Sequence, residues 1–486
     1  MRTRPAAALA VLAAAVFLSG LDQTVVVTIL PQVAVDLRLP FTRLDEVAWI
    51  VTAYLLGYAA AMPLLGRVAD VHGIRLVFLV SSLLFAAGSA WAASADALWS
   101  LVAARTVQAA GGGGLVPVAL AVAASIPTLR ARLIALGAVA GAAEAGAVLG
   151  PLWGSAFLEL FGWRAAFWVN LPLTALLVAA ALVLVPAAVP RGASVDWLGG
   201  VLAGLALLAL AIGISSESID LPAWGRFVAF ATAALLAALF VRRSGRAPSP
   251  LLPPQLYRRP AFAAANVANL LVGAALVVAL VQVPLFAAAV LDRSPAEGGI
   301  LLLRLTALIP VGAVAGGWLA GVLPMRTVAG AGMLVSSAGF LRLSAWDGAT
   351  GELPLTIDLA VTGFGFGLVL APLAGSALGA ARGGAEAISA ASLTISRTIG
   401  MLVGLASLTA WGVGAFERRV ARLPAPLPQR GQAEAVYRRL VDEYEQEVEA
   451  AAVFVFGRLF LAAAVLCTLA ALPSLWLRGD TDERSG

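Results

Sequence analysis

The chain comprises 486 residues, of which 61% are hydrophobic and 12% charged, and its net charge is +5. Soluble domains carry about 25% charged residues, so this composition excludes a water-soluble fold and predicts a protein surrounded mainly by lipid. The 32 basic residues are all arginine. They lie at the ends of apolar runs and not on one face, so we expect no nucleic-acid partner. With one histidine and one cysteine, a His/Cys zinc site is excluded, and we expect no metal and no cofactor.

The first apolar run follows Arg2 and Arg4, as the core of a secretory signal would. The run continues to Leu30 and therefore covers about 25 residues, which is enough to span a bilayer. We interpret it as the first membrane helix and not as a cleaved signal.

Apolar runs of similar length recur along the whole chain, separated by short breaks rich in Gly, Pro or Arg. The runs lie at 6–30, 46–66, 76–94, 98–123, 132–157, 163–186, 196–215, 225–242, 261–290, 298–322, 327–345, 354–379, 386–415 and 450–477. Fourteen crossings, an even number, place both termini on one side. Most loop arginines fall on that side, so the positive-inside rule predicts cytoplasmic termini in an inner membrane. The arginine-rich segment 416–449 is the exception.

The break between the second and third runs, in GYAAAMPLLGRVADVHGIR, is short and charged. The residues that characterise this break are Gly66, Arg67, Asp70, Gly73 and Arg75. We predict that the helix breaks at Gly66 and forms a tight hairpin, because Gly reaches conformations that other residues reach only at a cost. Asp70 would accept hydrogen bonds from helix-terminal N–H groups or pair with an arginine. The segment resembles the signature loop of the major facilitator superfamily, which implies a latch that opens and closes during transport.

The resemblance implies a fold of two six-helix bundles, and a segment rich in Pro and Arg separates eight apolar runs from six. We therefore predict an N-terminal bundle over 1–190, two inserted helices over 191–245, a cytoplasmic linker over 246–260 and a C-terminal bundle over 261–486. This all-α arrangement of fourteen transmembrane helices is that of the drug:proton antiporter branch of the superfamily.

Two charged residues lie inside early runs: Asp22 in SGLDQTVVVTILPQ, and Arg105, close to Gln108, in RTVQAAGGGGLVP. A charge within hydrocarbon is costly, so a functional role is the default interpretation. The alternatives are an aspartate that reaches water and an arginine bonded to backbone carbonyls. Both segments resemble superfamily motifs, which implies proton-coupling roles for Asp22 and Arg105.

The fifth run contains GAAEAGAVLGPLWGS, in which Gly146, Gly150 and Gly154 recur at four-residue spacing. These glycines line one helix face and permit close backbone packing, and Pro151 adds a bend. The segment resembles the antiporter signature of exporters, which favours export over uptake.

Glu144 lies in the same segment, about 18 Å along the helix from Arg132 and near the bilayer midplane. We predict that it pairs with Arg397, which lies about 22 Å from Arg382 on the same side. The pair would bridge the two bundles and break when Glu144 takes a proton. The alternative is that local hydroxyls and carbonyls satisfy each residue separately. We interpret Arg304 and Asp358, near opposite ends of their runs, as interfacial side chains.

The charged segment 416–450 contains apolar residues at helical spacing, with charges on the other face. They are Val436, Tyr437, Leu440, Val441, Tyr444 and Val448. We predict that the final helix continues out of the membrane as an amphipathic extension, paired with the end of the preceding helix. A solvated charged loop is the alternative.

Nearly the whole chain, including AWIVTAYLLGYAAAMPLLGRVAD and SRTIGMLVGLASLTAWG, resembles the mycobacterial triacylglyceride exporters. The resemblance implies a proton-coupled secondary exporter that moves apolar, triacylglyceride-like lipids by alternating access, with a periplasmic lipoprotein as partner. We expect the exporter to be a monomer. The alternative is a multidrug:proton antiporter for lipophilic cationic drugs. A membrane enzyme is the competing class, but no Ser–His–Asp set and no P-loop lysine appears.

Overall fold

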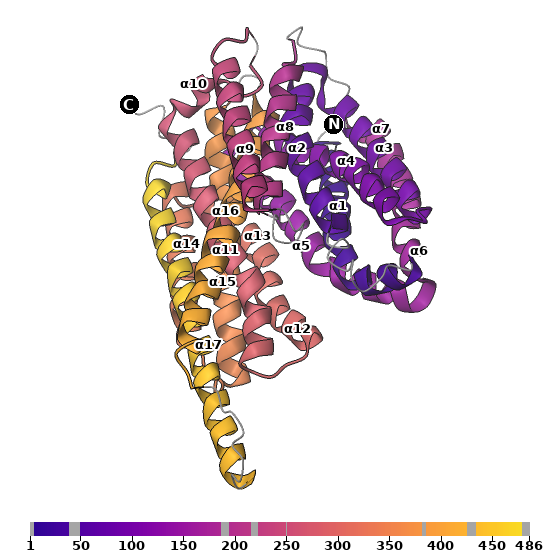
Figure 1. Ribbon diagram of the computed structural model, residues 1–486. Coiled ribbons are helices and arrows are strands. Elements are labelled where there is room, and N and C mark those ends of the chain that lie inside the picture. Colours follow the sequence, from indigo (N-terminus) through magenta and orange to yellow (C-terminus); the bar gives the residue numbers. More distant parts are fainter. Residues whose placement is uncertain are drawn as a thin grey trace.

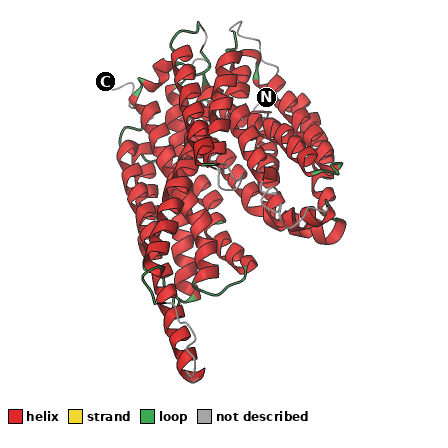
Figure 2. Ribbon diagram, in the orientation of Figure 1, coloured by secondary structure: helices red, strands yellow, loops and turns green. Residues whose placement is uncertain are grey.

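The computed structural model describes residues 4–37, 49–185, 194–214, 222–248, 250–381, 385–424 and 434–478, and every regular element in these ranges is a helix (Figure 1, Figure 2). The helices are α1 (Arg4–Asp36), α2 (Trp49–His72), α3 (Ile74–Ala93), α4 (Leu98–Ala124), α5 (Leu129–Phe161), α6 (Trp163–Trp168), α7 (Asn170–Leu184), α8 (Trp197–Ile214), α9 (Ala223–Ser244), α10 (Pro254–Tyr257), α11 (Pro260–Ala289), α12 (Pro295–Thr306), α13 (Leu308–Ala320), α14 (Met325–Leu343), α15 (Glu352–Ala380), α16 (Glu386–Val420) and α17 (Glu434–Ser474). Helices suit lipid because they satisfy their own backbone hydrogen bonds.

Each of the fourteen predicted runs coincides with a helix or with a pair of consecutive helices. Among the described residues, twelve spans are long and apolar enough to cross a membrane. The other two runs are α14, which carries Arg326 and Arg342, and α8, whose apolar stretch Trp197–Leu210 is shorter. Length and hydropathy therefore support twelve crossings, and the fourteen predicted crossings stay a prediction.

Two of the runs are interrupted helices, α6 with α7 and α12 with α13. The interruptions fall shortly before Pro172 and Pro310. A proline has no N–H and its ring crowds the carbonyl four residues earlier, so it kinks a helix at that point.

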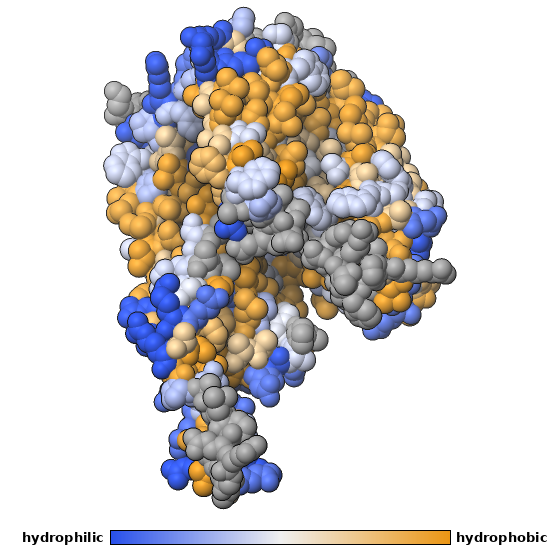
Figure 3. Space-filling view, in the orientation of Figure 1, coloured by the Kyte–Doolittle hydropathy of each residue, from blue (hydrophilic) through white to orange (hydrophobic). Residues whose placement is uncertain are grey.

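The helices form two groups, which we call the first group (α1 to α7) and the second group (α11 to α17) (Figure 1). The groups meet at the end of the molecule where both termini lie, which we call the terminus side. They separate toward the opposite end, the extension side, from which the first turns of α17 project. Figure 3 shows the surface hollowed between the two groups on the extension side. The predicted boundary at residues 190 and 191 lies outside the described residues.

The first group is built on close contact between α1 and α5, which the glycine repeat makes possible. A Cβ at Gly146 would lie 2.1 Å from the carbonyl oxygen of Phe17, and one at Gly150 would lie 2.0 Å from Oγ1 of Thr24. Thr24 Oγ1 also donates to the carbonyl oxygen of Ala147 at 2.7 Å, which joins the two helices by a hydrogen bond. Pro151 lies within α5, one residue beyond Gly150.

The two groups touch each other through two further glycine contacts near the terminus side. A Cβ at Gly66 of α2 would lie 3.0 Å from the carbonyl oxygen of Ala387 in α16, and one at Gly317 of α13 would lie 2.5 Å from that of Leu133 in α5. Small residues let helix backbones approach closely in lipid. These contacts close the molecule on the terminus side.

The last helix, α17, is continuous from Glu434 to Ser474 (Figure 1). The end of α16 packs against it, where the guanidinium of Arg419 lies 3.6 Å from the ring centroid of Phe454. Tyr437 and Val441 are half-buried on one face of its first turns, whereas Val436 and Leu440 are exposed. Within the predicted extension, residues 416–420 and 434–450 are helical, residues 421–424 form a turn, and residues 425–433 lie outside the described ranges.

On the extension side, α1 is tied to α6 through Asp36. Its carboxylate accepts hydrogen bonds from Gln32 Nε2 and Trp163 Nε1, each at 2.8 Å, and Arg164 lies 3.7 Å away. The bond from Gln32, the bond from Trp163 and the charge of Arg164 lower the pKa of Asp36.

Replacement of Gly150 by Ala is expected to destabilise the protein by about 1–3 kcal/mol, because the new methyl group would force α1 and α5 apart. The matched control is Gly330→Ala in α14, where a Cβ would meet nothing within 4 Å. Thermal unfolding in detergent measures both. An equal fall in Tm for Gly330→Ala and Gly150→Ala would contradict the claim that close contact between α1 and α5 causes the loss of stability.

Candidate functional site

The predicted latch lies where the two groups meet on the terminus side. The prediction that the helix breaks at Gly66 is wrong: α2 continues to His72, and Gly66 instead permits the close approach of α16. The chain turns at Gly73, whose φ of 100° is a conformation that residues with a Cβ rarely adopt. A single glycine therefore makes the hairpin between α2 and α3.

Asp70 links the two groups by hydrogen bonds. Its carboxylate accepts from the backbone N–H of Ala387 at 3.0 Å and from that of Ile388 at 3.1 Å, in the first turn of α16. Those N–H groups have no partner within their own helix, and the positive end of the helix dipole favours an anion there. Arg67 interacts electrostatically with Asp70. No hydrogen bond or ion pair of Arg75 is recorded within the described part of the chain.

A second polar cluster surrounds Asp22 inside the first group. Asp22 forms an ion pair with Arg105, and the two side chains are 1% and 0% exposed. Gln108 Nε2 donates to Asp22 at 2.9 Å, and Asn170 Nδ2 donates at 2.7 Å. Asp22 therefore does not reach water here. Arg105 is held mainly by the carboxylate, and it donates further bonds to Gln108 Oε1 at 2.6 Å and to the carbonyl oxygen of Asp22 at 3.1 Å.

A third site, in the middle of the molecule, joins the two groups through charge. Arg397 Nη1 of α16 donates to Glu144 Oε1 of α5 at 2.6 Å, and the side chains are 25% and 16% exposed. Gly273 lets α11 pack closely against α16 at Arg397. A Cβ at Gly273 would lie 2.0 Å from the carbonyl oxygen of Arg397. The structure thus brings together the two residues that the sequence pairs, and their role in coupling stays a prediction.

Two tyrosines of α2 lie between the charged sites. The guanidinium of Arg105 lies 4.1 Å from the ring centroid of Tyr54, within the range of a cation–π interaction. Tyr54 stacks on Tyr58 with 6.0 Å between centroids, and Tyr58 interacts electrostatically with Glu144 and Arg397. Side chains of the helix that carries the latch therefore interact with both ion pairs.

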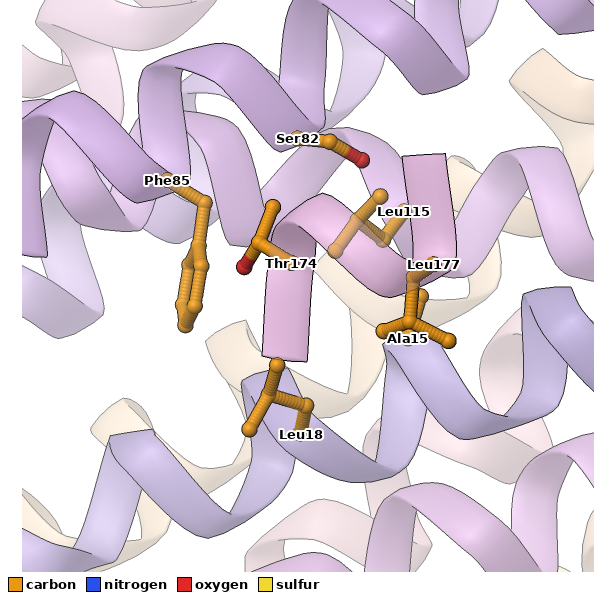
Figure 4. Close-up of a pocket in the computed structure, with 7 residues that line it drawn as sticks. All are labelled: Ala15, Leu18, Ser82, Phe85, Leu115, Thr174 and Leu177. Atoms are coloured by element: carbon orange, nitrogen blue, oxygen red, sulfur yellow. The ribbon is translucent and has the colours of Figure 1, made fainter. Parts of the chain in front are cut away.

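A small cavity lies in the first group (Figure 4). Leu18, which lines it, precedes Asp22 by four residues on α1. The cavity is lined by Ala15, Leu18, Ser82, Phe85, Leu115, Thr174 and Leu177 and has a volume of about 10 Å³. That volume is about the size of one water molecule, so the cavity does not hold a transported substrate.

The sequence of residues 12–416 matches the family model described as Major Facilitator Superfamily. The chain belongs to this superfamily. It is a multi-pass membrane transporter and not an enzyme, as the sequence predicts.

Curated relatives match the transporter over nearly its full length. A triacylglyceride transporter of Mycolicibacterium smegmatis is 38% identical, with 96% of this chain and 87% of the relative covered. The triacylglyceride transporter of Mycobacterium tuberculosis is 35% identical, with 96% of this chain and 94% of the relative covered. The transporter is therefore homologous to the mycobacterial triacylglyceride transporters, and the predicted resemblance is confirmed.

Solved structures support the fold. The human organic anion transporter MFSD10 aligns with a TM-score of 0.61 and 14% identity, over 95% of this chain and 99% of that chain. The Escherichia coli fucose:proton symporter aligns with a TM-score of 0.56 and 16% identity, over 95% and 98%. The predicted all-α membrane fold of the facilitator type is confirmed.

The interpretation of Asp358 as an interfacial side chain is wrong. Its side chain is 2% exposed, forms an ion pair with Arg342 and accepts a hydrogen bond from Trp346 Nε1 at 3.1 Å. Burial of a carboxylate requires such partners, and they come from the end of α14 and the turn after it. Arg304 remains near the extension side, where it donates to Glu352 at 2.7 Å.

Several members of the transporter's polar clusters are missed by the sequence reasoning. Asn170 and Ser89 belong to the Asp22 cluster, and Ser89 Oγ accepts from Gln108 Nε2 at 2.6 Å. Such residues can be recognised in the sequence as a single amide or hydroxyl group within an apolar run, as in FWVNLPL. A polar group of this kind requires a hydrogen-bonding partner inside lipid.

Replacement of Asp70 by Ala is expected to open the terminus side. A hydrogen bond to a charged group contributes about 1.5–3 kcal/mol. Loss of the two bonds that Asp70 accepts is therefore expected to shift the equilibrium between the closed and open terminus side at least tenfold toward the open state. Double electron–electron resonance between spin labels at exposed Thr128 and Thr327, in a Cys467→Ser background, measures the separation of the groups.

The control for the latch variant is Asp96→Asn, which removes a 93% exposed carboxylate on the extension side and is expected to leave the distances unchanged. Unchanged distances in Asp70→Ala would contradict the assignment of Asp70 as the latch.

Replacement of Asp22 by Asn is expected to destabilise the transporter by about 3–5 kcal/mol, because Arg105 becomes a buried, unpaired charge. The double variant Asp22→Asn/Arg105→Gln removes both charges and is expected to unfold at a higher temperature than Asp22→Asn. Asp36→Asn, at the surface, serves as the control, with an expected loss below about 1 kcal/mol. Thermal unfolding in detergent measures the stability of each variant. A double variant that unfolds at or below the temperature of Asp22→Asn would contradict the pairing of Asp22 with Arg105.

Proposed function

We propose that the protein is a proton-coupled exporter that moves triacylglyceride-like lipids by alternating access. The observation that carries the proposal is the Glu144–Arg397 ion pair, whose 2.6 Å bond joins the two groups in the middle of the molecule. The names of the relatives, triacylglyceride transporters, support the class of substrate.

Glu144 is the proposed proton acceptor because it is the more accessible carboxylate. It is 16% exposed, whereas Asp22 is 1% exposed and surrounded by three donors. A proton on Glu144 removes its charge and weakens its bond with Arg397. The second group is then free to rock, which opens the terminus side and closes the extension side.

The Asp22–Arg105 pair has a different proposed part in the cycle. It holds α1 against α4 and, through Tyr54, contacts the helix that carries the latch. We assign to Asp22 and Arg105 the transmission of charge changes within the first group, with Gly146, Gly150, Pro151 and Gly154 keeping α1 and α5 together during the movement.

The proposed orientation places the terminus side in the cytoplasm. The arginines in the last turn of α9, Arg242 and Arg243, and those of the segment after it lie on this side, in agreement with the positive-inside rule. With α8 and α14 counted as crossings, the chain spans the inner membrane fourteen times, in two six-helix bundles with α8 and α9 inserted. The extension side then faces outward, and α17 projects from the membrane.

The exposed first turns of α17 are the proposed contact surface for a periplasmic lipoprotein that accepts the lipid. Val436 and Leu440 are 51% and 41% exposed there, and they would provide apolar contacts. We propose that the transporter itself acts as a monomer.

The test is transport in proteoliposomes of a fluorescent triacylglyceride and of ethidium in parallel, with and without a proton gradient. Lipid movement driven by the gradient is expected for the wild-type chain. In Glu144→Gln, gradient dependence is expected to fall at least tenfold, because loss of a charge-assisted hydrogen bond of about 1.5–3 kcal/mol corresponds to that factor.

Glu159→Gln serves as the control, since Glu159 is an exposed carboxylate on the same helix. Ethidium movement without lipid movement would make the protein a multidrug antiporter. Equal gradient dependence in Glu144→Gln and the wild type would exclude Glu144 as the coupling residue.

A further inference from the structure

A large apolar cavity lies outside the contact between the two groups, where the inserted helices α8 and α9 cover α2 and α16. Its volume is about 430 Å³, within the range of about 300–1,000 Å³ that is typical of ligand sites. Its walls include Ala206 and Leu207 of α8, Ala237 and Phe240 of α9, and Pro63 of α2. Ala237 is exposed, so the cavity opens at its α9 wall toward the surrounding lipid.

The polar atoms of the cavity wall already have partners. Ser392 and Ser396 of α16 donate to Asn266 Oδ1 at 2.9 and 2.8 Å, and the hydroxyl groups of Tyr257 and Ser392 lie 3.0 Å apart. Burial raises the pKa of Tyr257, which therefore stays a neutral hydroxyl group. The wall offers no unmet donor or acceptor among these groups, so its occupant is a hydrocarbon.

The position of the cavity corresponds to one leaflet. The lining residues of α9 run from Phe230 to Phe240. Measured back from Arg243 at the end of this helix, they cover about 5–20 Å, and half of the hydrocarbon core is about 15 Å thick. The cavity therefore extends from the headgroup level on the terminus side to about the midplane.

Arginines gather at the headgroup end of the cavity. The segment 242–260 contains Arg242, Arg243, Arg246, Arg258 and Arg259 and neither Asp nor Glu. Arg243 is paired with Asp196 at 2.7 Å, and Arg259 donates to the carbonyl oxygen of Ala380. Arg242, Arg246 and Arg258 are exposed. Hydrophilic side chains cover the end of the molecule where α9 and α10 lie (Figure 3).

We propose that this cavity binds one acyl chain of an anionic phospholipid from the leaflet on the terminus side, with its phosphate at Arg242, Arg246 and Arg258. Exposed arginines at the headgroup end of an apolar cavity match a lipid that carries a negative headgroup, whereas a triacylglyceride has no charge to place there. The bound lipid is a resident ligand and not the transported substrate.

The cavity exists only while the latch is closed. Ile388, which lines the cavity, donates its backbone N–H to Asp70, and Pro63 lies two helical turns before Asp70 on α2. Separation of α2 from α16 would remove one wall. A ligand that binds only one state stabilises that state, so the lipid favours the conformation that is closed on the terminus side.

Native mass spectrometry of the full chain tests this binding, with phosphatidylglycerol or phosphatidylcholine of identical acyl chains added to the detergent. The wild type is expected to retain phosphatidylglycerol more strongly than phosphatidylcholine. Ala237→Phe is expected to weaken retention about tenfold, because it excludes at least two methylene groups from burial. Ala238→Phe, one residue along α9 and outside the cavity, is the matched control.

A second variant fills the cavity from α8: Ala206→Phe is expected to reproduce the loss, which keeps the test valid if Ala237→Phe folds poorly. The triple variant Arg242→Gln/Arg246→Gln/Arg258→Gln is expected to retain both lipids equally. Equal retention in Ala237→Phe and Ala238→Phe, no preference for phosphatidylglycerol in the wild type, or displacement of the lipid by triacylglyceride would each overturn the proposal. Binding is measured without transport, so these outcomes are independent of the proposed function.

Discussion

Charged groups inside lipid require partners, and this requirement organises the middle of the molecule. Asp22 meets Arg105, Glu144 meets Arg397, and Asp70 meets the first N–H groups of α16. The three sites differ in what they join, because the first lies within one group of helices and the other two bridge both groups. Since α2 carries Asp70 and also Tyr54 and Tyr58, one helix contacts all three sites. A change of charge at any of them therefore acts on the same element.

Two glycine contacts between the groups are related in position but differ in chemistry. Gly66 and Asp70 of α2 meet the start of α16, and Gly317 and Gly321 meet the start of α5, where a Cβ at Gly321 would lie 2.7 Å from Cγ of Arg130. In the second contact glycine stands where the first has an aspartate. One contact is thus held by a carboxylate on a helix end and can be released by loss of charge, whereas the other is a close packing of glycines against α5. In the proposed cycle, this asymmetry places control of release on α2.

Much of the fold follows from the sequence, because the apolar runs match the helices and the depth of Glu144 and Arg397 along their helices predicts their proximity. The Asp22–Arg105 pair does not follow in the same way, since the neighbours of a helix depend on bundle packing that periodicity does not specify. The role of Gly66 does not follow from the sequence for a related reason: glycine permits both a turn and a close approach, and only the position of α16 decides between them. Asp358 illustrates the same limit, because its partner Arg342 lies on another helix.

The length of α17 has a mechanical consequence. Its 41 residues form one helix, a rod about 60 Å long that is anchored in the second group for roughly half its length. Because a stiff rod turns as a unit, a small rotation of that group about its glycine contacts sweeps the free tip through a much larger arc. In the proposed cycle and orientation the helix therefore acts as a lever, and the position of its tip reports, outside the membrane, which way the central space is open.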